Sequence, residues 1–237
     1  MTQREQWRRM RSRFKFGLGG AIAAVLVGCS TPTSPEAADS LAVPVLDAPF
    51  ATLPSEPVSV TVTTAPSLSE ADLWERLQRP ETAAYVVLLR HAIAPGTGDP
   101  ASFRVADCST QRNLSAEGRS QAQQIGQAFR DRGVSVRRVA SSQWCRCLDT
   151  ARLMALGPVE PLPVLNSFFR DRSTAEAQTT ELKALLAAEA RTPGVLVMVT
   201  HQVNITALTD IVPRSGEAVV LAIEPDQLTL LGRLTPQ

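Results

Sequence analysis

Two continuous apolar runs, each ending close to a histidine, constrain the fold of this chain most strongly. Residues 85–89 (YVVLL) and 195–199 (VLVMV) show no alternation of apolar and polar positions. Strands of this kind are buried on both faces, as the central strands of parallel sheets are. The chain has only two histidines, His91 and His201, and each lies two residues beyond one of these runs. The two histidines are therefore expected at the ends of two central strands.

Stretches with apolar residues at helical spacing separate the apolar runs. Helices are expected at 69–79, within 113–133, at 146–156 with Gly157 as the stop, and from the capping box Ser173–Glu176 onward. Further strands are expected at 136–140 and as a pair within 217–234, and residues 58–64 could add an edge strand. The alternation of strands and helices predicts an α/β fold, a three-layer sandwich with a mostly parallel central sheet.

The carboxyl ends of the central strands are the expected place for a site. Ligands of open α/β sheets bind outside these strand ends. Both histidines follow such ends, and Arg90 directly precedes His91. The stretch SSQWCRCLDTA, residues 141–151, follows the strand at 136–140 and brings Arg146 to the beginning of a helix. We therefore expect two imidazoles and two guanidinium groups at one edge of the sheet.

These motifs, taken in order, resemble a known family. Arg90-His91 after a strand, residues 141–151, and Thr200-His201 after a second strand resemble the three signatures of the histidine phosphatase superfamily, also called the phosphoglycerate mutase-like family. The resemblance extends over roughly residues 85–234 and includes NLSAEGRSQA before the first long helix. Ala92 stands where the family mostly has glycine. The resemblance implies a phosphoglycerate mutase-like fold.

Phosphate chemistry explains these residue types. Phosphoryl transfer spreads negative charge over three equatorial oxygens, and a protein can supply positive charge and positioning. A neutral imidazole can attack phosphorus, giving a phosphohistidine that water then hydrolyses. The resemblance implies that His91 is the nucleophile and that His201 stabilises the transferring group. It also implies that Arg90 and Arg146 bind the phosphate. The predicted activity is a phosphatase acting on a phosphomonoester or other activated phosphate of a small molecule, through a phosphohistidine and without a cofactor.

The general acid is not in its usual place. Many members of the family carry a glutamate in an L-x-E context after the third strand, where this chain has Ser167, and another branch has an aspartate where this chain has Gln202. The candidates in loops near the site are Asp99, Asp107, Asp171 and Glu217. Of these, Asp171 is our candidate general acid. Without an acid, substrates with good leaving groups would be favoured, and a catalytically weak or inactive phosphate-binding envelope lipoprotein is the alternative function.

The first 29 residues have the layout of an export signal. Six Lys or Arg stand against one acid, and residues 16–28 form an apolar core that is too short for the roughly 20 residues of a membrane span. Residues 26–29 (LVGC) resemble the bacterial lipobox, which implies that Cys29 is lipidated and becomes the N-terminus. The predicted location is the bacterial cell envelope, lipid-anchored on the extracytoplasmic side, at the inner or outer membrane. No basic patch after residue 29 suggests a nucleic-acid partner.

Three segments follow from this pattern. Residues 1–28 are the predicted lipoprotein signal peptide, residues 29–68 a Pro/Ser/Thr-rich tether, and residues 69–237 the histidine phosphatase domain. The tether assignment rests on seven prolines and no glycine between residues 30 and 67, a composition that cannot bury enough apolar area to fold.

The cysteines of the domain permit a disulfide. In an oxidising compartment Cys108 could pair with Cys145 or with Cys147, and the alternative is that all three are small buried residues. A zinc site built from these thiols and the histidines is disfavoured, because arginines lie beside His91 and around the CRC stretch. No metal is therefore expected.

Overall fold

The structure is a computed structural model and describes residues 60–236. The predicted signal peptide 1–28, the lipidation site Cys29 and the tether up to residue 59 lie outside the described residues. Within residues 60–236 no helix combines the length and the apolar character needed to cross a membrane.

A seven-stranded sheet forms the centre of the domain, with the strand order β1-β7-β6-β2-β5-β3-β4. The strands are β1 (Thr61–Thr64), β2 (Ala84–Arg90), β3 (Val136–Ser141), β4 (Val159–Pro161), β5 (Gly194–Thr200), β6 (Ala218–Ile223) and β7 (Gln227–Leu234). Strand β6 runs antiparallel to both of its neighbours, and the other four pairings are parallel. The predicted α/β fold with a mostly parallel central sheet is confirmed.

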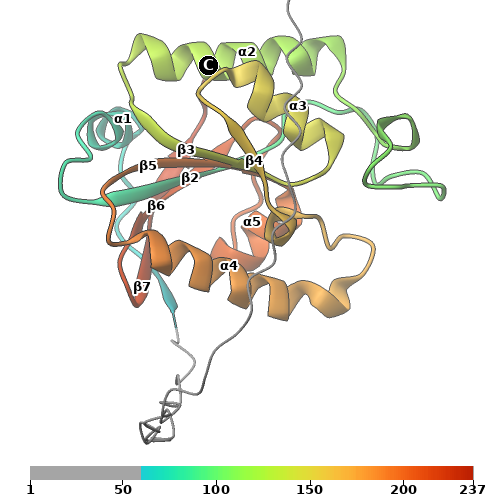
Figure 1. The fold of residues 1–237 in the computed structure, drawn as a ribbon. Helices are drawn as coiled ribbons and strands as arrows, with labels where there is room; N and C mark the ends of the chain where they lie inside the picture. Colours follow the sequence, from blue (N-terminus) through green and yellow to red (C-terminus); the bar gives the residue numbers. More distant parts are fainter. Residues whose placement is uncertain (1–59, 237) are drawn as a thin grey trace, which may run out of the picture. The chain divides into compact units, whose positions relative to one another are not determined.

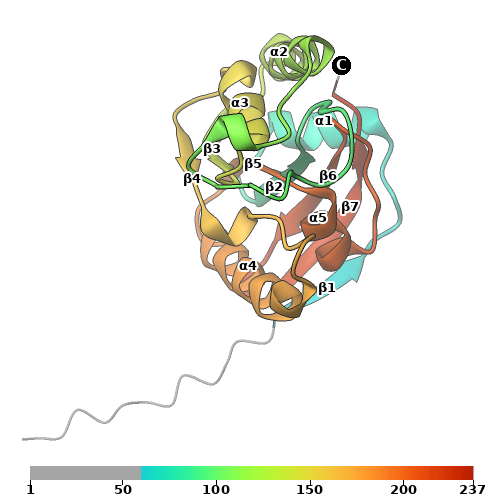
Figure 2. The same cartoon turned by 90° about the vertical axis from the view of Figure 1, so that its right-hand side faces the viewer.

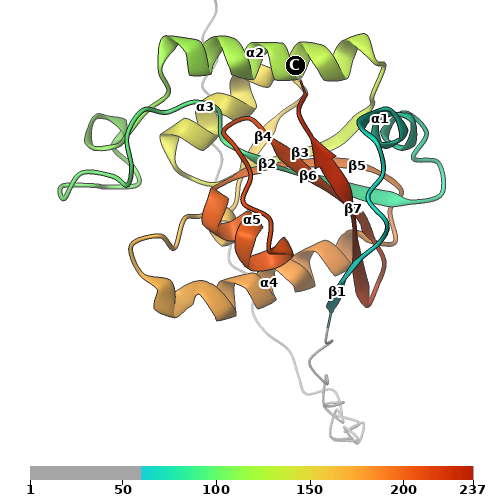
Figure 3. The ribbon, with the colours of Figure 1, turned by 180° about the vertical axis from the view of Figure 1, so that it is seen from behind.

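Helices cover both faces of this sheet. They are α1 (Glu70–Gln78), α2 (Ala116–Asp131), α3 (Cys145–Met154), α4 (Ala175–Glu189) and α5 (Gln202–Thr209). Figures 1 and 3 show α1, α2 and α3 on one face and α4 and α5 on the other. Short 3-10 turns lie at Cys108–Thr110, Pro163–Leu165 and Arg172–Thr174. The three layers that the sequence predicts are therefore present.

The central strands divide their side chains between two cores. In β2, Tyr85, Val87 and Leu89 pack in the cluster that contains the α1, α2 and α3 residues. Val86 and Leu88 pack in the opposite cluster, with α4 and α5. A strand buried on both faces needs apolar residues at every position, which explains why β2 and β5 lack the alternating pattern of a half-exposed strand.

Several boundaries differ from those predicted. Helix α3 ends before Ala155, which takes the left-handed conformation at φ 51°, so the stop comes two residues ahead of Gly157. The capping box at Ser173–Glu176 is wrong, because Asp171 accepts hydrogen bonds from the backbone N–H and the hydroxyl of Ser173 and starts a 3-10 turn there instead. Helix α5 and strand β4 are not predicted by the sequence pattern. Strand β1 lies within residues 58–64, where an edge strand was one possibility, so the sheet includes part of the stretch assigned to the tether.

The strand register positions the site. Strands β2, β5 and β3 are adjacent and parallel, and Arg90 of β2 lies opposite Thr200 of β5. His91 and His201 therefore leave the sheet side by side at its carboxyl edge. The long connection from β2 to α2 crosses this edge, as Figure 2 shows.

Candidate active site

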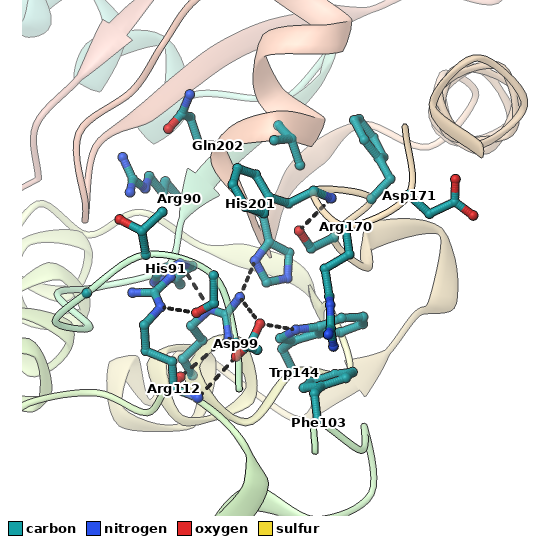
Figure 4. A pocket seen from close by; sticks show the side chains of 18 of the residues that line it. Arg90, His91, Asp99, Phe103, Arg112, Trp144, Arg170, Asp171, His201 and Gln202 are labelled. Atoms are coloured by element: carbon teal, nitrogen blue, oxygen red, sulfur yellow. Dashed lines mark hydrogen bonds and ion pairs between the residues drawn. The ribbon is translucent and has the colours of Figure 1, made fainter. Parts of the chain in front are cut away.

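The two imidazoles lie close together at this edge (Figure 4), and Arg146 contacts both of them. The ring centroids of His91 and His201 are 5.5 Å apart. Arg146, in the first turn of α3, places its Nε 3.2 Å from His91 Nε2 and its Nη2 3.4 Å from His201 Nδ1. The three residues are only 2–3% exposed. Together with Arg90 they line a cavity of about 360 Å³.

The environment of His91 keeps its ring neutral. Nδ1 lies 2.8 Å from the carbonyl oxygen of Ala92, which can only accept, so the ring proton is assigned to Nδ1. Nε2 then carries a lone pair and accepts the hydrogen bond from Arg146. Burial, followed by the charge of Arg146, lowers the pKa of His91 from 6.5 to about 3. An unprotonated nitrogen therefore faces the cavity at neutral pH.

His201 is neutral for the same physical reasons. Burial first, and the charge of Arg146 second, lower the pKa of His201 well below its ordinary value. Its Nε2 lies 2.9 Å from Ser142 Oγ, which also accepts from the backbone N–H of Trp144. This contact fixes the ring so that Nδ1 is directed to the guanidinium of Arg146.

Four arginines surround the cavity, two of which the motifs do not identify. Arg90 donates from Nη1 to the carbonyl of Pro213 at 2.9 Å, while its buried Nε has no partner. Arg112 lies in the β2–α2 connection and donates from Nε to the carbonyl of Gly98 at 2.9 Å and from Nη1 to that of Ala94. Arg170 lines the mouth of the cavity. The only sequence signal for Arg112 is its position directly before NLSAEGRSQA.

The four candidate acids differ in position. Asp99 and Asp171 line the cavity, whereas Asp107 caps the 3-10 turn at Cys108–Thr110 and Glu217 pairs with Arg233. Burial disfavours the charge of Asp99, but hydrogen bonds from Arg146 and from the backbone of Arg112 outweigh it and hold its pKa below the ordinary value.

Asp171 lies at the mouth of the cavity with an exposed carboxylate. Hydrogen bonds from the side chain and backbone of Ser173 lower its pKa. At neutral pH both carboxyl groups of the cavity are therefore ionised, and neither has the raised pKa that suits a proton donor. The lowered pKa argues against the general-acid role predicted for Asp171, a role that only activity measurements test. Ser167 and Gln202 line the cavity at the two positions where the resemblance would place an acid.

The disulfide joins Cys108 to Cys145, one of the two pairings left open by the sequence. It ties the β2–α2 connection to the residue directly before Arg146. Cys147 is a free buried thiol, and burial raises its pKa to about 12. Among residues 60–236 no group of three or more His, Cys, Asp or Glu side chains is arranged to hold a metal ion.

The family model for the histidine phosphatase superfamily (branch 1) matches residues 86–180, from β2 into α4, and includes His91 and Arg146. Residues 86–180 are therefore similar to the histidine phosphatase superfamily. His201 lies beyond the matched residues, so its place in this site rests on the geometry alone.

Solved structures of phosphatases resemble this chain at low sequence identity. The protein histidine phosphatase SixA in complex with tungstate is 16% identical with a TM-score of 0.49, over 64% of this chain and 97% of that chain. The alpha-ribazole phosphatase from Shigella flexneri is 18% identical with a TM-score of 0.47, over 62% and 94%. A phosphoserine phosphatase mutant from Entamoeba histolytica in complex with phosphoserine is 12% identical with a TM-score of 0.48, over 65% and 98%. No curated protein matches the chain.

Neither imidazole should titrate at physiological pH. Because the pKa values of His91 and His201 are lowered, both rings should stay neutral between about pH 5 and pH 8, where an ordinary histidine gains its proton. Nitrogen-15 NMR of the two ring systems, recorded over this range, measures this directly. The chain unfolded in denaturant is the control, since both rings should then titrate near pH 6.5. A midpoint near 6.5 for either ring in the folded protein would contradict the assignment of a neutral pair.

Proposed function

We propose that this protein is a phosphatase that hydrolyses the phosphorylated form of a small molecule through a phosphohistidine on His91. One observation carries the proposal: the lone pair of a neutral, buried His91 faces a cavity lined by Arg90, Arg112 and Arg146. A nucleophile surrounded by fixed positive charge is what transfer of a phosphoryl dianion requires. The family match supports phosphatase chemistry.

The geometry suggests the course of the reaction. A phosphoryl oxygen takes over the hydrogen bond that Arg146 Nε makes to His91 Nε2, which frees the lone pair. Nε2 then bonds to phosphorus while the bond to the leaving oxygen breaks, and that oxygen departs with the electron pair. The contact between Nδ1–H and the Ala92 carbonyl stabilises the positive ring. Water next attacks phosphorus, the P–N electron pair returns to Nε2, and inorganic phosphate leaves.

His201 has a second role in this scheme. A dianionic phosphoryl group entering beside the ring raises the pKa of His201, because an opposite charge favours the protonated form. The protonated Nδ1 would then donate to a phosphoryl oxygen in place of accepting from Arg146.

Phosphohistidine formation distinguishes the phosphatase from a protein that only binds phosphate. Rapid-quench incubation with p-nitrophenyl phosphate should yield acid-labile phosphate on His91, detected by mass spectrometry after an alkaline quench. His91→Ala should abolish both the adduct and turnover, and Arg146→Ala should lower kcat about 100- to 1,000-fold, as loss of one charged donor at a transition state does. Arg152→Ala, an exposed arginine on the same helix, should retain full activity. Undiminished turnover in His91→Ala would exclude the mechanism, and phosphate binding without adduct or turnover would establish the binding-protein alternative.

The substrate should have a leaving group that needs little protonation. Both carboxylates of the cavity are ionised, so the leaving oxygen receives no proton from an ordinary carboxylic acid. Acyl phosphates, phosphoramidates and aryl phosphates meet this condition. Phe103, Trp144, Phe168 and Phe169 line the cavity, which favours an aryl group among the three.

A series of phosphomonoesters with rising leaving-group pKa tests this expectation. Alkyl phosphates should react at least about 100-fold more slowly than aryl phosphates. Their poor leaving groups need a proton, and a general acid typically contributes about 100-fold or more to the rate. Asp171→Asn should leave the slope of kcat/KM against leaving-group pKa unchanged. A flat dependence in the wild type that becomes steep in Asp171→Asn would instead identify Asp171 as the general acid.

We further propose that the chain is an exported lipoprotein, with signal peptide 1–28, a tether that runs from residue 29 to the beginning of β1, and a lipid anchor, palmitate included, on Cys29. The lipobox-like sequence carries this proposal, and the Cys108–Cys145 disulfide supports it because disulfides persist in oxidising compartments. The phosphatase domain would then act on the extracytoplasmic side of the bacterial membrane.

Membrane fractionation of the full chain in a bacterial host tests the anchor. Wild type should sediment with membranes, whereas Cys29→Ala should lose the lipid and its membrane retention after processing. Ser30→Ala changes the neighbouring residue, keeps the cysteine and should behave as wild type. Lipidation at this residue would be refuted if Cys29→Ala stayed with the membranes as wild type does and the masses of the two proteins differed only by the Cys-to-Ala change.

A further inference from the structure

We propose that Asp99 is a positioning residue for Arg146, and that it acts on phosphoryl transfer only through this guanidinium. The inference rests on the proposed phosphatase function. Asp99 belongs to none of the three motifs and lies in the β2–α2 connection, whereas Arg146 comes from α3.

The contact between the two side chains is bidentate. Arg146 Nη1 donates to Asp99 Oδ1 at 2.7 Å and Nη2 donates to Oδ2 at 3.2 Å. The two side chains are only 4% and 7% exposed, so solvent does little to screen this pair. A fork of two parallel hydrogen bonds defines the plane of a guanidinium as well as its distance.

Asp99 is itself held from the other side. The backbone N–H of Arg112 donates to Oδ1 at 3.0 Å, and the indole Nε1 of Trp144 donates to Oδ2 at 3.1 Å. Each carboxylate oxygen therefore accepts one hydrogen bond from Arg146 and one from a donor that the fold immobilises. Trp144 is further fixed by stacking on Phe103, with ring centroids 4.8 Å apart.

The two edges of the Arg146 guanidinium have separate tasks. Asp99 occupies the edge formed by Nη1 and Nη2. The edge formed by Nε and Nη2 is directed to the two imidazoles, at 3.2 Å from His91 Nε2 and 3.4 Å from His201 Nδ1. This second edge lies where a phosphoryl group attached to His91 would place its oxygens. Asp99 can therefore stay bound while the substrate reacts, and Figure 4 shows it beside the indole of Trp144.

A competing interpretation makes a different prediction. If Asp99 instead occupied the phosphate position as an internal anion, its removal would tighten phosphate binding and raise activity. If Asp99 positions Arg146, its removal lets the guanidinium swing away, and displacements of about 1 Å can cost about 100-fold in rate.

A double-mutant cycle tests the proposal. With 4-methylumbelliferyl phosphate as the substrate, Asp99→Asn should lower kcat about 10- to 100-fold, where kcat is expressed per active site counted as phosphoenzyme. The same variant should bind inorganic phosphate more weakly in calorimetry. In the Arg146→Ala background, Asp99→Asn should change neither kcat nor phosphate binding, because the guanidinium that Asp99 positions is already missing. Asp99→Glu keeps the charge and should recover part of kcat. Asp107→Asn, on the same connection but bonded to Ser109, is the matched control and should behave as wild type.

The outcomes separate this inference from the proposed function. An equal loss of kcat from Asp99→Asn in both backgrounds, or tighter phosphate binding in Asp99→Asn, overturns the positioning role. If the wild type binds phosphate but neither forms phosphohistidine nor turns over, the phosphatase proposal fails, and the same cycle read in phosphate affinity decides the role of Asp99. If Asp99→Asn then weakens phosphate binding only where Arg146 is present, the positioning role is supported. If it weakens phosphate binding equally with and without Arg146, the positioning role is overturned.

Discussion

The in-register parallel pairing of β2 with β5 is the constraint on which the site depends. It sets Arg90 opposite Thr200, so that the next residue of each strand, His91 and His201, leaves the sheet at the same height. A slip by one residue would exchange the two faces of a strand. Because β2 and β5 are apolar throughout, burial alone would tolerate such a slip. The polar residues at the strand ends and the antiparallel pairing of β2 with β6 help to set the register, which an all-apolar run does not define by itself.

The charge distribution at this edge follows from burial. Arg146 is a buried cation that has one carboxylate partner, while Arg90 and Arg112 bring further positive charge to the same cavity. An unpaired buried charge is costly, so such a cluster stabilises an anion that enters it. Desolvation first, and the same positive charge second, lower the pKa values of both imidazoles. One arrangement would therefore serve both the proposed binding of a phosphoryl group and the proposed nucleophile, which must be neutral.

Much of the fold could be predicted because each major element has a local signal. The apolar runs predict β2 and β5, Ser69 begins α1 as its N-cap, and the spacing of Ala122, Ile125 and Phe129 predicts α2. The capping box at Ser173 failed because Asp171 accepts the hydrogen bonds of the Ser173 backbone N–H and hydroxyl. Two overlapping local motifs compete for the same backbone N–H, and the pattern of residue types fits both. Helix α5 was missed since it is short and lies directly after a strand, where no periodicity has room to develop.

Some residues of the site could be predicted from the sequence and others could not. His91, His201, Arg90 and Arg146 are attached to strand ends or to a helix start, so topology alone predicts that they gather. Arg112 and Asp99 belong to an irregular connection, whose path no periodic pattern describes. Cys108 pairs with Cys145 and leaves Cys147 facing the core of the domain, a difference of two residues on one helix that spacing along the chain does not decide.

The β2–α2 connection is a fixed wall of the cavity, which bears on how specificity arises. The Cys108–Cys145 disulfide closes 37 residues, a constraint worth about 4 kcal/mol in the chain-entropy account. Arg112 bonds to two carbonyls of the same connection, and Phe103 stacks on Trp144. A loop held at this many points has lost its conformational freedom before the substrate arrives, so binding need not supply that ordering free energy. In the proposed phosphatase the connection would therefore be a preorganised part of the site, and selection among substrates would depend on how their leaving groups fit a rigid mouth.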